Sequence, residues 1–271
     1  MNPDVVVDNH SLEIRKLILE AAEGGRRGHI PSAFSIVEIL SILYGNVAKH
    51  YPNSPLHESR DRIILSKGHG CLALFAVLAH HGYFKKEMLK TFCKYDSLLG
   101  GHPEKGQLPG VEASTGSLGH GVAIGVGMAK AAQILGRTNK VFVIIGDGEL
   151  AEGSIWESAL AASQHKLSNL IIIVDYNKYQ SYDLVEKIWN LEPLSQKWQA
   201  FGFECITIDG HNTSEIYEAL IKKTIGIPRV IIANTTKGKG IDFLENNLDW
   251  HHKSNISDSE INDLKAGLLD A

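Results

Sequence analysis

The feature that most constrains the fold is an alternation of apolar runs with helix-forming stretches, which begins at Lys140. Each apolar run has the length of a strand buried on both faces of a sheet. The runs predict strands at 141–145, 170–174, 204–208 and 229–233, with helices near 155–165, 194–201 and 214–224. Such strand-helix alternation predicts an α/β fold, a doubly wound and mostly parallel sheet with helices on both faces.

The first 140 residues are less regular. They predict helices at 11–23, 32–44, 71–80 and 118–135, a strand at 62–65 and a glycine-rich loop at 98–117. Ser32 is the expected N-cap of its helix, and Gly136 ends the helix before it. A terminal helix is predicted at 257–269, where Ser257 and Glu260 have the spacing of a capping box. No linker or repeat interrupts the pattern, so residues 1–271 are predicted to form a single domain.

Polar residues follow two of the predicted strands. Gly146, Asp147 and Gly148 come directly after the strand at 141–145, and Asn177 follows the strand at 170–174. The carboxyl ends of parallel strands meet at one edge of a sheet, where ligands bind. A helix amino-terminus with a glycine beside it presents N–H groups to phosphate, and carboxylate and amide oxygens suit Mg²⁺. The pattern predicts an anchor for a metal ion and a diphosphate.

These residues carry a resemblance to a known family. Gly-Asp-Gly at 146–148, followed by Asn177, resembles the thiamin-diphosphate signature that several enzyme groups share. Segments at 28–31, 65–70, 101–104, 114–119, 209–212 and 237–251 resemble transketolase, in transketolase order. The resemblance covers only the amino-terminal, diphosphate-binding half (a PP-type domain), and the sequence stops at Ala271, where a full-length transketolase would continue. It is therefore identified as the amino-terminal subunit of a split transketolase.

The resemblance implies a set of site residues and a cofactor, thiamin diphosphate with Mg²⁺ (or Ca²⁺ or Mn²⁺). The implied metal ligands are Asp147, Asn177 and the backbone carbonyl of Tyr179. The implied cofactor-binding residues are His69, Gly116, Leu118, Gly146, Asp147, Gly148, Glu152, Asn177 and His251. The implied catalytic residues are His29, His69, His102, His251 and Glu152.

Histidine is abundant in this sequence, with 13 residues. In the resemblance, His29, His69 and His102 line the cleft around the thiazolium and hydrogen-bond sugar hydroxyls, a task that suits imidazole near neutral pH. His251 is preferred to His252 as the late site histidine. A structural hydrogen bond is expected for His211. The remaining loop and helix-end histidines are expected to be solvent-exposed and without a role: His10, His50, His57, His80, His81 and His165.

Three further features leave alternatives open. Glu152 matches an acid that lies at the dimer interface of transketolases, linked to the cofactor sites, although a solvated acid in a helix's first turn is the simpler interpretation. Arg26 and Arg27 replace the small polar residues expected before Gly28. They are either solvated or in contact with an anionic group of a substrate.

The helix at 118–135 carries Gly121, Gly125 and Ala129 at intervals of four residues. This narrow face permits close packing, either against the sheet of the same chain or against another subunit. Both alternatives remain open.

The implied reaction is the transfer of a two-carbon ketol unit from a ketose (phosphate) donor to an aldose acceptor. A separate pyrimidine-binding subunit would complete the enzyme as an α2β2 heterotetramer, supplying the activating glutamate and the arginines that hold substrate phosphate. One alternative is an acyloin-forming subunit that acts on an unusual sugar. Others are the α-type subunit of a 2-oxo acid dehydrogenase, which does not account for segments 65–70 and 101–104, and a non-catalytic subunit.

Composition excludes several other classes. A net charge of −4 and the lack of a basic stripe argue against nucleic-acid binding. No apolar run approaches the roughly 20 residues of a membrane span, and the amino-terminus carries two acids instead of the basic region of a signal peptide. Cys71, Cys93 and Cys205 lie in apolar surroundings, far apart in the sequence. They are expected to be inert thiols of the core, which fits a reducing cytoplasm.

Overall fold

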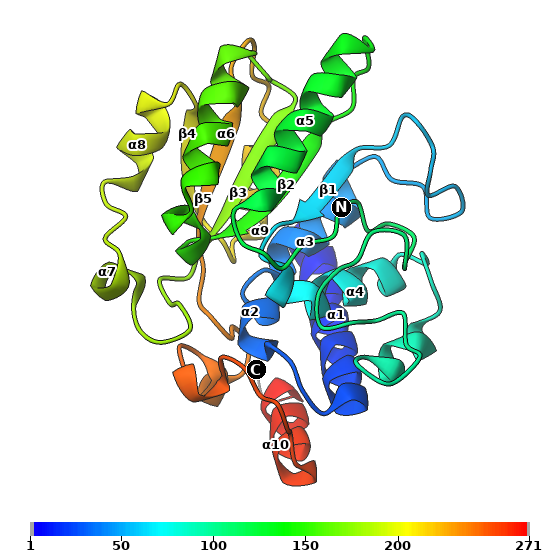
Figure 1. Ribbon diagram of the computed structural model, residues 1–271. Coiled ribbons are helices and arrows are strands. Elements are labelled where there is room, and N and C mark those ends of the chain that lie inside the picture. The colour runs from blue at the N-terminus through cyan, green and yellow to red at the C-terminus, as the bar shows by residue number, and fades with distance from the viewer. Residues whose placement is uncertain (1–2, 270–271) are drawn as a thin grey trace.

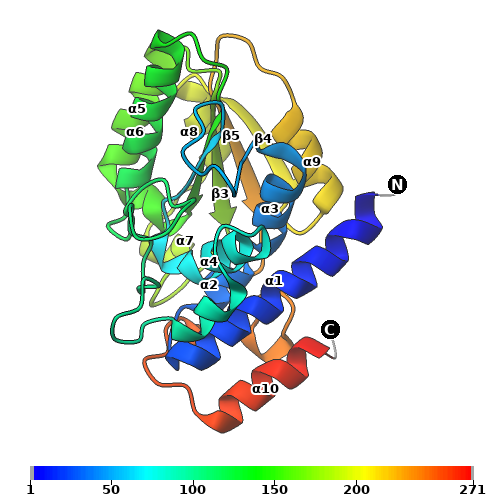
Figure 2. The ribbon, with the colours of Figure 1, turned by 90° about the vertical axis from the view of Figure 1, so that its right-hand side faces the viewer.

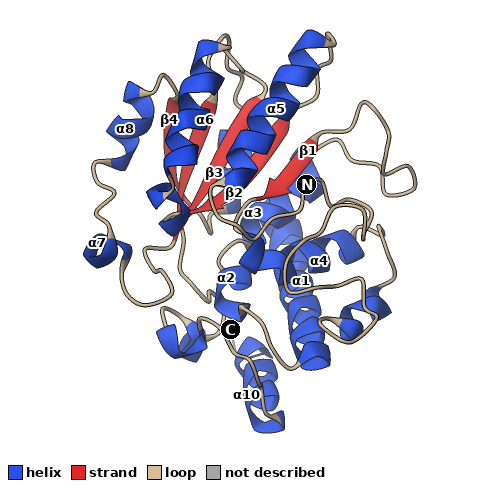
Figure 3. Ribbon diagram, in the orientation of Figure 1, coloured by secondary structure: helices blue, strands red, loops and turns tan. Residues whose placement is uncertain are grey.

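The computed structural model describes residues 3–269, and its centre is a five-stranded parallel sheet (Figure 3). The strands are β1 (Arg62–Leu65), β2 (Val141–Gly146), β3 (Leu170–Tyr176), β4 (Glu204–Asp209) and β5 (Arg229–Asn234), in the order β1-β2-β3-β5-β4. All neighbouring strands are parallel. All five predicted strands are present, and the predicted fold class is confirmed.

Helices cover both faces of the sheet (Figures 1 and 2). One face carries α5 (His120–Ile134), α6 (Gly153–Gln164) and α8 (Leu194–Ala200), and the other carries α1 (Pro3–Gly25), α3 (Val37–Ile42), α4 (Cys71–His80) and α9 (Thr213–Ile221). Along β2, Phe142 and Ile144 join the apolar cluster of the second face, whereas Val143 and Ile145 join that of the first. Every residue of β2 is therefore buried, which explains its continuous apolar sequence.

The small-residue face of α5 packs against the sheet of its own chain. A Cβ atom at Gly121 would lie 2.3 Å from the Ser66 hydroxyl oxygen, and one at Gly125 would lie 2.5 Å from a methyl carbon of Val143. Ala129 on the same face is fully buried. Of the two alternatives for this face, close packing within the chain is the one observed.

The predicted helix at 32–44 is wrong, and so is Ser32 as its N-cap. The segment forms α2 (Ile30–Phe34), α3 and a π-helical turn, η1 (Leu43–Val47). At the break, the carbonyl oxygen of Ser32 accepts a hydrogen bond from Nζ of Lys67 (3.0 Å), and the Ser35 hydroxyl donates to Asp175 (2.8 Å). A continuous helix would use that carbonyl within the helix, so the buried Lys67 and Asp175 hold the break in place.

The last helix, α10 (Asp258–Leu269), packs along α1 (Figure 2). Its capping box is confirmed, because the N–H of Ser257 donates to the Glu260 carboxylate (2.9 Å) and the N–H of Glu260 donates to the Ser257 hydroxyl (3.2 Å). Short helices that sequence patterns did not predict are η2 (Gly68–Gly70), η3 (Lys86–Thr91), η4 (Gly148–Ala151), α7 (Val185–Ile188), η5 (Asp242–Leu244) and η6 (Leu248–Trp250). Within residues 3–269, no helix has both the length and the apolar character needed to cross a membrane.

A backbone pairing joins the segment after α1 to the segment before α10. Gly28 and Lys253 exchange two hydrogen bonds, of 2.9 and 3.2 Å, and the N–H of Ile256 donates to the carbonyl of Arg26 (2.9 Å). The Arg26 guanidinium also pairs with Asp258. This pairing brings residue 29 next to residues 251 and 252.

Candidate active site

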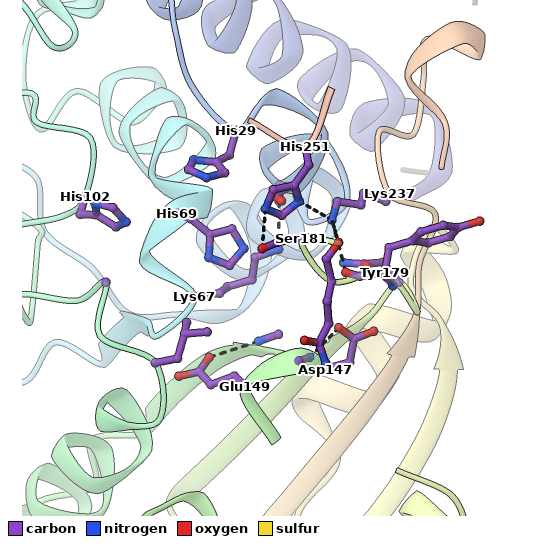
Figure 4. A pocket seen from close by; sticks show the side chains of 17 residues that line it. His29, Lys67, His69, His102, Asp147, Glu149, Tyr179, Ser181, Lys237 and His251 are labelled. Carbon is purple, nitrogen blue, oxygen red and sulfur yellow. Dashed lines mark hydrogen bonds between the residues drawn. The ribbon is translucent and has the colours of Figure 1, made fainter. Parts of the chain in front are cut away.

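A cavity of about 290 Å³ lies at the carboxyl ends of the central strands (Figure 4). It is lined by His29, Ser32, Lys67, His69, His102, Gly116, Leu118, Gly146, Asp147, Gly148, Glu149, Asn177, Tyr179, Gln180, Ser181, Lys237 and His251. These include every residue predicted for the site except Glu152. The fold therefore brings together residues from segments that are far apart in the sequence.

Oxygen atoms from two adjacent strand ends form the floor of the cavity. The carboxylate of Asp147 accepts hydrogen bonds from the N–H groups of Gly148 (2.7 Å) and Lys178 (2.5 Å). Asn177 Oδ1 accepts one from the N–H of Tyr179 (3.0 Å). Each of these oxygens has a further lone pair. A carboxylate, an amide oxygen and a main-chain carbonyl are the donor set that Mg²⁺ accepts.

A buried ion pair beneath the floor fixes the orientation of the amide. The side chains of Lys67 and Asp175 are 1% and 0% exposed and in direct contact. Asp175 also accepts hydrogen bonds from Asn177 Nδ2 (2.8 Å) and from the hydroxyls of Ser35 and Thr235. Because the nitrogen of the amide points to Asp175, its oxygen stays available to the cavity. Burial opposes the ionisation of Asp175, but the Lys67 ammonium holds its pKa below the ordinary value.

The charge balance of the floor fits a divalent cation. Burial, and next the Asp175 carboxylate, raise the pKa of Asp147 to about 7. A cation between Asp147 and a diphosphate would relieve this unfavourable charge. Among the described residues, no group of three or more His, Cys, Asp or Glu side chains is arranged to hold a metal ion. A site for Mg²⁺ needs no such group, since phosphate oxygens and water complete its shell.

A second buried ammonium, that of Lys237, lies across the cavity. It donates to Nδ1 of His251 (2.8 Å) and approaches the carbonyl oxygens of Tyr179 (3.3 Å) and Gln180 (3.4 Å). Burial, and next the charge of Lys67, lower the pKa of Lys237 to about 8, so it stays mostly protonated at pH 7. No carboxylate pairs with Lys237 among the described residues, which leaves its charge for an anionic ligand.

Histidines form the wall opposite the floor (Figure 4). The ring centroid of His29 lies 5.4 Å from those of both His69 and His251, and the rings of His69 and His251 are 6.3 Å apart. Burial lowers the pKa of His29 to about 3, that of His251 to about 4 and that of His69 well below its ordinary value. Neutral rings can both donate and accept hydrogen bonds. The wall therefore suits hydroxyl groups.

The more exposed His102 reaches the same cavity because a glycine makes room for it. Gly116 has a φ of 148°, and a Cβ atom there would lie 2.8 Å from the His102 ring. Burial lowers the pKa of His102 as well. A larger residue at 116 would therefore clash with this ring unless one of the two shifts.

Of the two late histidines, His251 lines the cavity and His252 does not. Because an ammonium can only donate, Nδ1 of His251 accepts from Lys237 and the ring proton lies on Nε2, 3.1 Å from the Ser181 hydroxyl. The ring of His252 packs on that of His29, with centroids 4.5 Å apart. The structure thus places His251 where the sequence analysis preferred it.

Two glutamates near the floor have different environments. Glu149 is buried and accepts hydrogen bonds from the N–H of Gly119 (2.8 Å), the N–H of Gly146 (3.3 Å) and the Ser66 hydroxyl. Glu152 is exposed at the start of α6 and makes no capping hydrogen bond. It does not line the cavity, so its role at an interface stays a prediction.

Sequence reasoning missed Lys67, Glu149, Asp175 and Lys237. Lys67 and Lys237 lie inside segments 65–70 and 237–251, which carry the resemblance to transketolase. A lysine within a segment that resembles the family's site is the sequence signal by which both could have been predicted as site residues. Asp175 and Glu149 gave no signal of their own, because their partners come from distant parts of the chain.

His211 has the structural role expected for it. Its Nδ1 lies 2.9 Å from the Glu38 carboxylate, and its Nε2 accepts a hydrogen bond from the N–H of Thr236 (2.8 Å). These bonds tie α3 to the loop after β5, outside the cavity.

The expectation of exposed histidines holds for His57 and His165 but is wrong for four others. The four are partly buried and lie in a chain of tilted and edge-to-face rings, with centroid distances of 5.3, 5.2 and 5.0 Å between neighbours: His10, His80, His81 and His50. We call these four residues the peripheral histidine cluster.

The thiols also differ from expectation, since only Cys71 is fully buried and it shares a cavity with Cys93.

Comparisons with known proteins agree on the relatives of this chain. Residues 7–268 match the model of "Transketolase, thiamine diphosphate binding domain". The chain is 45% identical over 240 residues to an apulose-4-phosphate transketolase subunit of Actinobacillus succinogenes, covering 88% of this chain and 87% of that protein. It is 44% identical over 241 residues to a 6-deoxy-6-sulfo-D-fructose transketolase subunit of Clostridium sp., covering 88% of each.

Solved structures show the same relationship. The transketolase from Leishmania mexicana has a TM-score of 0.91 and 30% identity, and that from Campylobacter jejuni has a TM-score of 0.90 and 33% identity. Each similarity covers 97% of this chain but only 41% or 42% of the transketolase. The chain thus spans about two fifths of the length of these solved relatives, whereas it spans most of the two transketolase subunits named above.

Proposed function

We propose that this chain, which belongs to the transketolase family through its thiamine diphosphate binding domain, is the amino-terminal subunit of a transketolase. It takes part in moving a two-carbon ketol unit from a ketose or ketose phosphate to an aldose. The proposal depends mainly on one observation. Within one cavity, the oxygen atoms of Asp147 and Asn177 at the strand ends face a group of neutral histidines. We also propose that residues 1–271 form a single domain.

The floor of the cavity holds thiamin diphosphate and its metal ion in this proposal. Mg²⁺, or Ca²⁺ or Mn²⁺ in its place, is bound by Asp147, Asn177 and the carbonyl of Tyr179. Gly148 and the Lys237 ammonium would hold the diphosphate. Further contacts with the cofactor come from Gly116, Leu118, Gly146 and His69. When bound, the thiazolium ring supplies the electron sink for carbon–carbon cleavage.

The histidine wall orients the sugar and moves protons. His251 carries its proton on Nε2 and donates it toward a hydroxyl or carbonyl oxygen of the substrate, while Lys237 holds its other nitrogen. His29, His69 and His102 are neutral because burial disfavours their charged forms. As neutral rings they donate hydrogen bonds to the sugar hydroxyls and accept hydrogen bonds from them.

The reaction requires a second subunit in this proposal. A separate pyrimidine-binding subunit supplies the activating carboxylate, in an α2β2 assembly with this chain. The relatives named as transketolase subunits, which this chain covers over most of their length, support this arrangement. The exposed position of Glu152 also suits an interface, as do the apolar Ile134 and Leu160, which are 72% and 59% exposed on α5 and α6. Three free cysteines fit the reducing cytoplasm.

A second candidate has the same chemistry with a less common sugar. The relatives in Actinobacillus succinogenes and Clostridium sp. are named for apulose 4-phosphate and 6-deoxy-6-sulfo-D-fructose. A donor of this kind is therefore the main alternative to a common pentose phosphate. The relatives reported above are transketolases, which favours ketol transfer over the reaction of a 2-oxo acid dehydrogenase.

Loss of Asp147 tests the cofactor site. Asp147→Ala removes the carboxylate ligand of the metal ion but no packing of the apolar core, so the chain folds. We expect calorimetry on the complex with the partner subunit to show no Mg²⁺-dependent binding of thiamin diphosphate. Asp263→Ala, at an exposed position on α10, is the matched control and should bind as wild type does. Unchanged binding by a folded Asp147→Ala variant contradicts the site.

Dependence on a partner is tested separately. The purified chain alone should show no ketol transfer between xylulose 5-phosphate and ribose 5-phosphate, and addition of the pyrimidine-binding subunit should restore it. Turnover by the rigorously pure single chain would refute the requirement for a second subunit.

A further inference from the structure

The segment 209–212, at the carboxyl end of β4, does not line the cavity of the candidate site, but it contacts the loop that carries Lys237. That loop follows β5, and the N–H of Thr236 donates a hydrogen bond to Nε2 of His211 (2.8 Å). The other ring nitrogen of His211, Nδ1, lies 2.9 Å from the Glu38 carboxylate. Because a carboxylate can only accept and a backbone N–H can only donate, the ring proton lies on Nδ1. His211 is therefore held in the tautomer that can bind the loop.

A buried ion pair fixes the position of Glu38. Nη1 of Arg15, on α1, lies 2.6 Å from the carboxylate of Glu38, on α3, and the two side chains are 7% and 10% exposed. Burial opposes the ionisation of Glu38, but the charge of Arg15 and the hydrogen bond from His211 lower its pKa to about 2. Glu38 is therefore charged at pH 7 and keeps the His211 ring in this orientation.

The same network holds the loop at a second point. Nε of Arg15 donates a hydrogen bond to the carbonyl oxygen of Lys239 (3.0 Å). A Cβ atom at Gly240 would lie 2.9 Å from the same nitrogen, so the loop packs directly on Arg15. The two hydrogen bonds, at Thr236 and at Lys239, lie on either side of Lys237 in the sequence. The backbone around Lys237 is thus tied to α1, α3 and the end of β4.

The side chain of Lys237 depends on such an anchor, because it is a buried cation. Lys237 is 1% exposed, and within residues 3–269 no carboxylate forms an ion pair with it. Burial of an ammonium without a counter-ion is unfavourable, so a flexible lysine moves toward water unless its backbone holds it in place. Figure 4 shows Lys237 directed at His251, to whose Nδ1 it donates a hydrogen bond (2.8 Å).

Loss of the His211 ring would affect this loop more than the rest of the fold. Among the residues that the structure describes, the ring nitrogens of His211 bind only Glu38 and Thr236. Without the ring, Glu38 keeps its ion pair with Arg15, which joins α3 to α1. The N–H of Thr236, by contrast, loses its acceptor. The contact of His211 with the loop can therefore be removed while the other half of the network stays.

We propose that His211 is a positioning residue, which holds the loop after β5 so that the Lys237 ammonium stays on Nδ1 of His251. It lies outside the cavity and acts through Lys237. The proposal rests on the ketol transfer proposed above, because that reaction gives His251 a sugar oxygen to which it donates. The geometry of the histidine wall then depends on a histidine that is not part of the wall.

A pair of variants that differ by one methylene group separates the two contacts of His211. In His211→Asn, the amide can replace Nδ1 as the donor to Glu38, but the side chain ends before the position of Nε2. In His211→Gln, the amide oxygen reaches that position and can accept from Thr236. In the complex with the partner subunit, Mg²⁺ and saturating thiamin diphosphate, His211→Asn should lower kcat about tenfold, and His211→Gln should stay within about threefold of wild type. Equal losses in both variants would contradict the role of Nε2 as an acceptor.

His50→Asn is the matched control. It makes the same exchange at another partly buried histidine, whose Nε2 contacts the backbone carbonyl of Tyr44 (2.8 Å) far from the loop. It should leave kcat unchanged. If His211→Asn does not fold, His211→Phe, which keeps a ring but has no acceptor, replaces it with the same expected loss.

A double-mutant cycle tests whether His211 acts through Lys237. Lys237→Gln removes the ammonium, and with it the group that His211 is proposed to position. The double variant His211→Asn and Lys237→Gln should lose about as much kcat as Lys237→Gln alone, roughly tenfold, whereas independent residues would together cost roughly 100-fold. A loss near the larger value would overturn the proposal, since it would show that His211 supports activity by another route.

The nitrogen chemical shift of His251 Nδ1 provides a readout that needs no turnover, because it reports whether this nitrogen accepts a hydrogen bond. It is measured by NMR on the full chain, with the signal assigned by its loss in His251→Gln. His211→Asn should move the shift toward its value in Lys237→Gln, whereas His211→Gln should leave it at the wild-type value. An unchanged shift in folded His211→Asn would overturn the proposal.

The two kinds of measurement separate the failure of this proposal from that of the proposed function. If the wild-type complex transfers no ketol unit, ketol transfer is wrong, and the Nδ1 signal alone then decides whether His211 positions Lys237. If the complex is active but neither kcat nor the Nδ1 signal changes in His211→Asn, the positioning role is wrong and ketol transfer stands.

Discussion

Two groups of histidines lie at opposite ends of α4, and only one of them faces a site. The site group precedes the helix at His69 and includes His29, His102 and His251, whereas the peripheral histidine cluster lies around His80, at the helix end. Both groups hold several imidazoles within stacking distance of one another. Their comparison shows what makes a histidine cluster functional in this protein.

Burial affects the two groups in the same way. It lowers the pKa of His29 to about 3, and it lowers the pKa of His81 to about 4. Both rings are therefore neutral at pH 7. A perturbed pKa is a common sign of an active site, but here it does not separate the two groups.

The surroundings of the rings do separate them. Those of the site face a cavity that also holds Lys237 and the oxygens of Asp147. In the peripheral cluster, the His50 ring packs on Tyr44 and Tyr83, and its buried Nδ1 has no hydrogen-bond partner among the described residues. We infer that function here depends on what the rings face and not on their number or their pKa.

Removal of a site histidine should have the largest effect. His69→Ala and His102→Ala each remove one group that donates to, or exchanges a proton with, a sugar hydroxyl, which typically costs about 10²–10⁴-fold in rate. We expect this loss in kcat for the reconstituted enzyme, with cofactor affinity within roughly tenfold of wild type. Two silent variants would show that these rings do not touch the substrate.

The cation that orients a site histidine should matter less. Lys237→Gln takes away the ammonium donor to Nδ1 of His251, which we expect to cost roughly tenfold in kcat at saturating thiamin diphosphate, since the variant also loses a contact with the diphosphate. Burial, and next Lys237, lower the pKa of His251, so this pKa should rise in the variant when followed by NMR. Lys239→Gln, two residues away and paired with Glu245, is the control. A His251 pKa that does not rise contradicts the orientation inferred here.

The peripheral histidine cluster should affect stability in acid instead. Burial, and next His50, His80 and His10, lower the pKa of His81 to about 4. Between its ordinary pKa of 6.5 and about 4, the unfolded chain binds a proton that the folded chain does not, so stability falls as pH falls through this range.

The size of this acid effect is limited because the His81 ring is partly exposed, and solvent screening leaves about 1 kcal/mol. His81→Gln should therefore lose about 1 kcal/mol less stability than wild type between pH 7 and pH 5 in urea unfolding. His57→Gln, at an exposed position, should behave as wild type does. An unchanged pH dependence in His81→Gln would mean that other groups dominate the acid response.

The smallest effect on activity is expected for His80, the last residue of α4. His80→Ala should leave kcat near the wild-type value, because its ring does not line the cavity of the candidate site. It serves as the direct counterpart of His69→Ala, eleven positions away at the other end of α4, since His69 lies in η2 just before that helix. A loss of rate as large as that of His69→Ala would remove the distinction between the two groups.

The site residues that could be predicted are those that directly follow a strand, because the apolar run of the strand shows where they lie in the sheet. Asp147 and Asn177 follow strands whose apolar runs are unmistakable, and parallel pairing aligns Gly146 with Asp175. That these two residues lie at the same edge of the sheet can therefore be predicted without knowing how the rest of the chain folds. For the same reason the sheet and most helices were predictable.

The parts that were missed depend on contacts between distant residues. The buried pairing of Lys67 with Asp175 joins positions 108 residues apart, and it also interrupts the helix predicted over 32–44. No local pattern encodes such a contact. The peripheral histidine cluster was misjudged for the same reason, since His50 and His81 become buried only when their segments meet.

The backbone pairing between Gly28 and Lys253 has a consequence for protein synthesis. The paired residues are 225 positions apart (28 to 253), so His29 leaves the ribosome long before His251 is made. At about 5–20 residues per second, this interval lasts on the order of 10–50 seconds. The sheet and the metal-binding floor can form within it, but the histidine wall cannot. A nascent chain therefore carries the metal-binding residues Asp147 and Asn177 before it carries the complete wall that would act on a sugar.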